Sequence, residues 1–177
     1  MPDKIKENIL IDKKEIKNKL LKRENFYYIV IISIIFYLDR FSKIQIINNF
    51  SDTSNYFNSF INFDLVWNTG IGFGLLSSNS SLVYNLITAI IGIVILYLFY
   101  IVINSKLFDS IVFSVIIGGA LGNFYDRLIF YAVPDFIDVH YKNFHWFTFN
   151  IADIFITIGI IIFIIKGLFE KNTHEKN

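Results

Sequence analysis

The sequence contains no cysteine, which excludes disulfide bonds, thiol catalysis and metal sites built from thiolates. It offers no serine and histidine that suggest a nucleophilic pair, and its three histidines form no recognisable set of metal ligands. We interpret His140 and His145 as surface residues of a loop, and we expect neither a metal nor another cofactor. The formal net charge of +1 argues against general nucleic-acid binding, which needs a basic surface.

Apolar residues are abundant instead. Hydrophobic residues make up 54% of the 177 residues, and the mean hydropathy is +0.52. The apolar residues are concentrated in four segments: 26–47, 82–103, 107–125 and 151–169. Each segment is close to the length of about 20 residues that crosses the hydrocarbon core of a bilayer. The sequence therefore predicts an all-α membrane protein with four transmembrane helices.

The distribution of Lys and Arg predicts the orientation in the membrane. Residues 1–25 hold eight of these cations, the stretch 48–81 holds none, and the short link between the second and third segments holds Lys106. By the positive-inside rule, both termini and the link are cytoplasmic. We expect a basic cytoplasmic extension (1–25), a membrane domain (26–169) and a cytoplasmic tail (170–177). The protein is then a multi-pass protein of the cell membrane.

Two short stretches in the outward loops have strand patterns. The stretch 61–67 begins with strict alternation of apolar and polar residues, so that Ile61, Phe63, Leu65 and Trp67 share one face, and a turn signal at residues 68–70 follows. Residues 144–149 form a second, aromatic-rich candidate. Because Trp and aromatic residues favour the membrane interface, the sequence predicts a small β-sheet at the extracytoplasmic surface.

Polar side chains gather near the outward ends of the predicted helices. Ionisable residues in or beside a membrane span are functional candidates by default. The group consists of Asp39, Lys43, Asn123, Asp126, Arg127, Asp135, Asp138, Asn150 and Asp153. A proton relay would tend to place acids through the depth of the membrane. Here only Asp109 lies near an inner end, which argues against a transporter or ion pathway.

Several of these residues also have purely structural interpretations. Asp39 and Lys43 lie four residues apart and could pair only with each other. Arg127 could anchor a helix end at lipid head groups, and Asp153 could simply favour the positive end of a helix dipole. A membrane scaffold, whose polar residues only hold helices together, is therefore a further alternative to an enzyme.

The small and amide residues have structural interpretations too. Three asparagines could cap helices or turns: Asn68, Asn123 and Asn150. The glycine-rich stretch at 118–122 contains a Gly-x-x-x-Gly spacing, which predicts close packing of helices.

Carboxylates are the catalytic groups that remain once thiols, a serine–histidine pair and metal ligands are set aside. Two carboxyl groups held close together share one proton, so that one can activate water while the other donates to a carbonyl. That chemistry is peptide hydrolysis by an aspartic dyad. The partner of Asp153 is Asp126, Asp135 or Asp138, and spacing alone does not choose among them.

Five motifs occur in an order that resembles the lipoprotein signal peptidases, the signal peptidase II family of bacterial membrane aspartic peptidases. The motifs are LDRFSK, NTGIGFGLL, GGALGNFYDR, VPDFIDV and FNIAD, and the resemblance covers about residues 26–168. Two residues depart from the family pattern. Gly72 stands where Ala or Ser is usual, and Pro134 stands where Val is common.

The resemblance implies a function and a set of site residues. Asp135 and Asp153 match the catalytic aspartates. The residues that match the family's supporting and substrate-holding positions are Asp39, Lys43, Asn68, Gly70, Asn123, Arg127 and Asn150; we add Ala152 as a small residue beside the acid. The implied substrate is a diacylglyceryl-modified prolipoprotein, cut just before the lipidated cysteine. Membrane lipids are the expected surroundings, and a monomer is the expected state.

Overall fold

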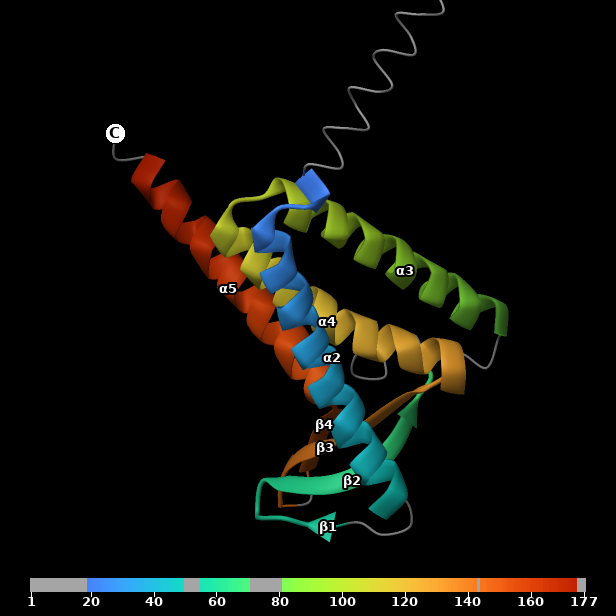
Figure 1. Ribbon diagram of the computed structural model, residues 1–177. Helices are drawn as coiled ribbons and strands as arrows, with labels where there is room; N and C mark the ends of the chain where they lie inside the picture. The colour runs from blue at the N-terminus through green and yellow to red at the C-terminus, as the bar shows by residue number, and fades with distance from the viewer. Residues whose placement is uncertain (1–18, 50–54, 71–80, 143, 175–177) are drawn as a thin grey trace, which may run out of the picture.

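The computed structural model describes residues 19–49, 55–70, 81–142 and 144–174. Four long helices are present in these residues: α2 (Arg23–Asn49), α3 (Ser81–Asn104), α4 (Leu107–Phe130) and α5 (Ile151–His174). Helix α4 packs against each of the other three. The start of α2 and the C-terminal end of α5 lie at one end of the bundle, and the sheet lies at the other (Figure 1).

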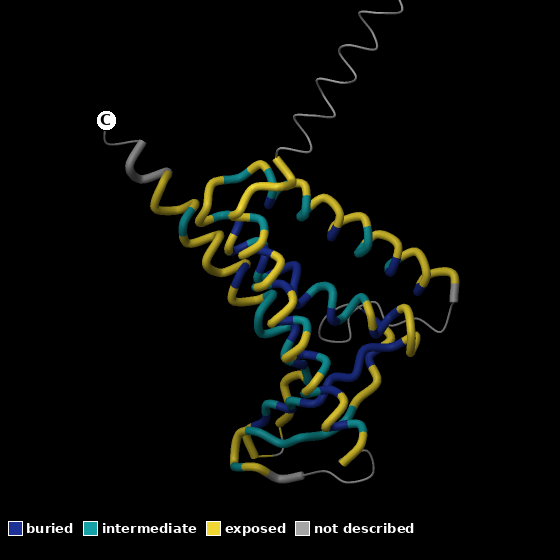
Figure 2. The backbone as a smooth tube through the Cα atoms, in the orientation of Figure 1, coloured by how far each residue is buried: buried dark blue, intermediate teal, exposed yellow. Residues whose placement is uncertain are grey.

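Three of the described helices are long and apolar enough to cross a membrane. They are Leu82–Asn104 in α3, Leu107–Phe130 in α4 and Ile151–Glu170 in α5. Many of their residues are exposed (Figure 2). The exposed residues include many large apolar side chains, which suits a lipid environment. Helix α2 is 27 residues long but is not among the three, and Asp39, Arg40 and Lys43 interrupt its apolar run. The prediction of a fourth span therefore stays a prediction.

A small antiparallel sheet covers the end of the bundle opposite the start of α2 and the C-terminal end of α5 (Figure 1). Its order is β1 (Asn55–Tyr56), β2 (Ile61–Asn68), β3 (Val133–Tyr141) and β4 (Phe144–Phe149). The predicted strands 61–67 and 144–149 are confirmed as β2 and β4. The predicted turn after β2 is also present, because Asn68 Oδ1 accepts a hydrogen bond from the Gly70 backbone nitrogen.

Strand β3 was not predicted, although it is the strand that joins β2 to β4. Its sequence lacks a period-two alternation, because both of its faces are largely buried. Pro134 has no N–H to donate to a neighbouring strand. It lies where β3 pairs with β2 but not with β4, so no carbonyl of β4 loses a donor there. His140 lies in this strand and is buried, so our interpretation of it as a surface loop residue was wrong.

Glycines let the helices approach closely around α4. A Cβ atom at Gly118 would lie 2.8 Å from Ile35 Cβ on α2, and one at Gly119 would lie 2.6 Å from the Ala152 carbonyl oxygen on α5. A Cβ atom at Gly122 would lie 2.3 Å from Asp39 Oδ2. The predicted close packing is thus confirmed, and at Gly122 it brings the α2 carboxylate against α4.

Candidate active site

Asp135 lies near the start of β3, and both of its carboxyl oxygens accept hydrogen bonds from asparagine side chains. Asn68 Nδ2 lies 2.8 Å from Oδ2, and Asn150 Nδ2 lies 2.6 Å from Oδ1. The orientation of the Asn68 amide is fixed, because its oxygen accepts from the Gly70 backbone nitrogen. Asp135 is 2% exposed, so these donors replace the water it has lost.

Asp153 lies in the first turn of α5 and forms a reciprocal cap with Asn150. The Asp153 backbone nitrogen donates to Asn150 Oδ1 over 3.1 Å, and the Asn150 backbone nitrogen donates to Asp153 Oδ2 over 3.2 Å. This is the geometry of a capping box, which satisfies the free N–H groups at the start of a helix. Asn150 therefore caps α5, as one structural interpretation predicted. It also contacts the carboxyl groups of both Asp135 and Asp153.

A third asparagine supports Asp153 from α4. Asn123 Nδ2 donates to Asp153 Oδ1 over 2.8 Å, while Asn123 Oδ1 accepts from Lys43 Nζ over 2.8 Å. The amide is thus oriented by the lysine. Asn68, Asn123 and Asn150 share one arrangement: the oxygen of each accepts from a fixed donor, and the nitrogen of each donates to a carboxylate of the site.

Lys43 lies at the centre of a buried ionic cluster next to these residues. Its Nζ lies 2.8 Å from Asp39 Oδ2 and 2.7 Å from Asp126 Oδ2, and the lysine is fully buried. Arg40 contacts the other oxygen of Asp126. The pairing of Asp39 with Lys43 is real, but it is part of a larger network. Asp126 has both oxygens bound to cations, which makes it a poor proton shuttle.

Asp39 and Arg127 connect this cluster to the surrounding elements. Asp39 Oδ1 accepts from the backbone nitrogen of Ala152, a residue that is fully buried in the first turn of α5. Arg127 donates to the Gly70 carbonyl oxygen over 2.8 Å and to the Asn123 carbonyl oxygen over 3.1 Å. Arg127 is only 5% exposed, so it holds the turn after β2 rather than lying free among lipid head groups.

Asp138 lies outside the group. Its Oδ2 atom is 2.7 Å from His145 Nδ1, across the β3–β4 hairpin. Asp153 has three candidate partners, and of these only Asp135 shares a contact residue with it. That shared residue is Asn150.

Burial raises the pKa of the Asp135 carboxyl to about 6, and the nearby charge of Asp153 contributes to the rise. The hydrogen bonds from Asn68 and Asn150 oppose it, because they favour the ionised form. A carboxyl group that titrates near neutral pH can both accept and donate a proton in catalysis.

Comparison with known proteins shows the family of this chain. The family model described as Signal peptidase (SPase) II matches residues 31–169. The chain belongs to the signal peptidase II family. The lipoprotein signal peptidase of Pelagibacter ubique is 45% identical over 160 residues, which cover 87% of this chain and 96% of that protein. The lipoprotein signal peptidase of Anaplasma phagocytophilum is 37% identical over 156 residues, which cover 85% and 97%.

A solved bacterial membrane enzyme has the same fold as this signal peptidase II chain. The two superpose with a TM-score of 0.70 at 33% identity, covering 85% of this chain and 92% of the other. The resemblance read from the five motifs is confirmed, and the chain is a peptidase. Part of the NTGIGFGLL motif, including Gly72, lies outside the described residues.

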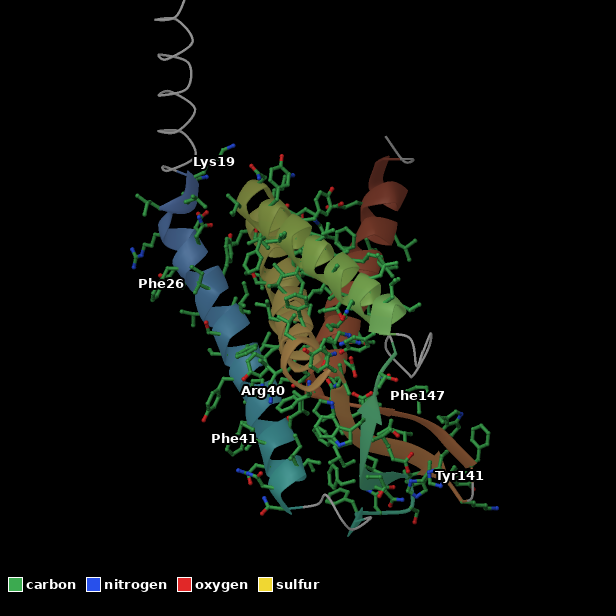
Figure 3. All side chains as sticks on the ribbon, turned by 90° about the vertical axis from the view of Figure 1, so that its right-hand side faces the viewer. Lys19, Phe26, Arg40, Phe41, Tyr141 and Phe147 are labelled. Atoms are coloured by element: carbon green, nitrogen blue, oxygen red, sulfur yellow. The ribbon has the colours of Figure 1, made fainter. Side chains whose placement is uncertain are left out.

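Sequence reasoning missed one member of this candidate site. Arg40 was not singled out, although it lies within the LDRFSK motif and contacts Asp126 on α4. The available signal was its place in an otherwise apolar run beside Asp39. Arg40 on α2 and Phe147 on the sheet lie at the same level of the molecule, on opposite sides of the bundle (Figure 3).

A pocket of about 260 Å³ opens beside Asp153. It is lined by Phe147, Phe149, Asp153, Ile154, Thr157 and Ile158, from β4 and the first turns of α5. Its walls are almost entirely apolar, and Asp153 is the one ionisable residue among these lining residues.

Proposed function

We propose that this chain is a membrane aspartic endopeptidase that removes the signal peptide from diacylglyceryl-modified prolipoproteins, cutting just before the lipidated cysteine. Membership of the family supports the peptidase class, and relatives bear the name lipoprotein signal peptidase. The single observation that carries the catalytic assignment is the contact of Asn150 with the carboxyl groups of both Asp135 and Asp153.

The proposed reaction uses one proton shared by the two carboxyl groups. The ionised carboxylate takes a proton from a water molecule, whose oxygen attacks the scissile carbonyl carbon. The protonated carboxyl donates its proton to the carbonyl oxygen, giving a tetrahedral diol. The proton taken from water then passes to the leaving nitrogen, and one hydroxyl of the diol returns its proton to the carboxylate that had donated one. The C–N bond breaks, an acid and an amine are released, and the pair again holds one shared proton. The asparagine amides orient both carboxyl groups throughout.

The surroundings of the pair suit a lipidated peptide. The apolar pocket beside Asp153 offers a place for an apolar group of the substrate. The exposed apolar faces of the helices offer a surface for acyl chains. We assign site support to seven residues outside the pair and its bridging Asn150: Asp39, Lys43, Asn68, Gly70, Asn123, Arg127 and Ala152.

We further propose that the protein acts as a monomer in the cell membrane, with both termini in the cytoplasm and the site near the extracytoplasmic face. The basic N-terminal residues support this orientation through the positive-inside rule. The sheet, whose strand β3 carries Asp135, lies at the end of the bundle opposite the start of α2 and the C-terminal end of α5 (Figure 1).

The test is cleavage of a diacylglyceryl-modified prolipoprotein by the purified protein. Wild type should release the signal peptide, and Asp135→Asn and Asp153→Asn should each abolish release while the protein still accumulates in membranes. Asp64→Asn, which changes an acid of β2 outside the site, is the matched control and should cleave normally. An intact substrate with wild type, or cleavage by Asp153→Asn, would contradict the proposal.

A further inference from the structure

A second group of ionisable side chains lies on the β3–β4 hairpin, apart from the carboxylate pair. It consists of Asp138 and His140 on β3 and His145 on β4, whose ligand atoms all lie within 4.8 Å of one another. Asp138 Oδ2 is 2.7 Å from His145 Nδ1 and 3.6 Å from His140 Nδ1. The two imidazole rings stack with their centroids 5.2 Å apart.

The register of the hairpin explains why these three side chains meet. Residues two apart on a strand share a face of the sheet, so Asp138 and His140 point the same way. His140 and His145 are direct partners across the two strands, and directly opposite residues also share a face. The register shifts between Val139 and His140, which fixes the position of the two histidines relative to Asp138.

Two buried polar atoms near Asp138 have no hydrogen-bond partner among the residues that the structure describes. One is Nδ1 of His140, whose residue is 6% exposed, and the other is Oδ1 of Asn62. Asn62 is the direct partner of Asp138 on β2, so its side chain lies on the same face. Buried polar atoms without a partner destabilise a fold, and a water molecule or an ion at this position would satisfy them.

We propose that Asp138, His140 and His145 bind a divalent transition-metal ion of the zinc type. Two imidazoles and one carboxylate are ligands that suit such an ion, and three protein ligands leave one position open. Metal–ligand distances of about 2.0–2.2 Å in a tetrahedron place ligand atoms about 3.3 Å apart. The separations of 2.7 and 3.6 Å from Asp138 Oδ2 lie on either side of that value, and all three ligand atoms lie within 4.8 Å of one another.

The exposure of the three side chains suits this role. The side chain of His145 is 54% exposed, so the ion can enter from outside and keep a water molecule. The side chain of Asp138 is only 5% exposed, and a bound cation would balance its charge there. Asn62 Oδ1 can accept a hydrogen bond from a metal-bound water molecule.

The metal would clamp the hairpin that carries the proposed catalytic groups. Asp135 lies three residues before Asp138 on β3, and Asn150 follows directly after β4. An ion that joins the two strands therefore restrains both ends of the contact between Asp135 and Asn150. The site is separate from the carboxylate pair, so metal binding does not depend on the proposed peptidase mechanism.

The experiment measures metal binding to the full chain in detergent, purified through a tag without histidine and stripped with a chelator. Co²⁺ is titrated while visible absorption is recorded, Zn²⁺ is then added as competitor, and hydrogen exchange of residues 133–149 is followed with and without Zn²⁺. The variants are His145→Ala, which changes a half-exposed side chain, and Asp138→Asn. His174→Ala, which changes the third histidine of the chain, and Asp153→Asn are the controls.

Wild type should bind one equivalent of Co²⁺, with Zn²⁺ displacing it, and amide exchange in the hairpin should slow. His145→Ala and Asp138→Asn should bind at least tenfold more weakly, while His174→Ala and Asp153→Asn bind as wild type does. Absence of saturable binding to wild type, or equal affinity of His145→Ala, would overturn the site. Binding without slower exchange in the hairpin would overturn the clamp.

Discussion

The side-chain nitrogen of Asn150 lies 2.6 Å from Oδ1 of Asp135 and links the last residue before α5 to the start of β3. The same asparagine caps α5 through its exchange of hydrogen bonds with Asp153. One side chain thus fixes a helix terminus and a strand relative to each other. The N-terminal cap of α5 therefore contacts both carboxyl groups and fixes their positions.

Replacing Asn150 should separate its two roles. Asn150→Ala removes the cap and the donor to Asp135, so we expect a loss of about 1 kcal/mol in stability and of about 100-fold in cleavage rate. Asn150→Ser keeps a capping oxygen but reaches Asp135 poorly. Its melting temperature should therefore recover while its cleavage rate stays low. Recovery of both together would show that Asn150 acts only as a cap.

The raised pKa of Asp135 predicts a pH dependence of stability. In the folded protein this carboxyl has a pKa of about 6, against the usual value of 3.8. Between these pH values the folded state holds a proton that the unfolded state has released, so the free energy of unfolding falls as pH rises through this range and levels off above about 6.

Asp135→Asn lacks this titrating group. The difference in melting temperature between Asp135→Asn and wild type should therefore shift in favour of the variant from pH 4 to pH 6 and remain constant at higher pH. Melting curves in one detergent, recorded at several pH values, measure it. A difference that does not change with pH would show that the pKa of Asp135 is not raised.

Gly122 tests the approach of Asp39 to α4. In Gly122→Ala the new methyl group would lie 2.3 Å from Asp39 Oδ2, so the carboxylate must leave its contacts with Lys43 and Ala152. We expect reduced stability and reduced cleavage. Gly167→Ala is the matched control, because nothing lies within 4 Å of its new Cβ atom. It should be neutral or raise stability by up to about 1 kcal/mol, the gain of alanine over glycine in a helix.

The absence of cysteine makes the topology directly measurable. Single cysteines placed at Lys22, Asn49, Lys106 or Lys142 can be labelled in intact cells with a membrane-impermeant thiol reagent, without any background from the native chain. If α2 is the fourth span, the variants at Asn49 and Lys142 should be labelled, while those at Lys22 and Lys106 should react only after the cells are opened. Equal labelling at Lys22 and Asn49 would contradict a span between them.

Much of the fold could be predicted because membrane helices leave a strong local signal. The apolar segments predicted all four long helices, alternation predicted β2, and a run of aromatic residues predicted β4. Strand β3 was not predicted, because a strand that is buried on both faces shows no alternation of apolar and polar residues. His140 was misplaced for the same reason, and with it the cluster on the hairpin went unnoticed.

The sequence by itself determined the helices and, through five ordered motifs, the family. The side of each loop and the reliance on carboxylates are its predictions. These features depend on local composition and on short spacings that one stretch of chain carries alone. Spacing left three possible partners for Asp153 and the resemblance implied Asp135, but only the tertiary structure shows what each of these acids contacts. Asp126 is bound by Lys43 and Arg40, Asp138 faces two histidines, and Asp135 shares Asn150 with Asp153. These contacts join residues from different helices and strands, so no local pattern could contain them.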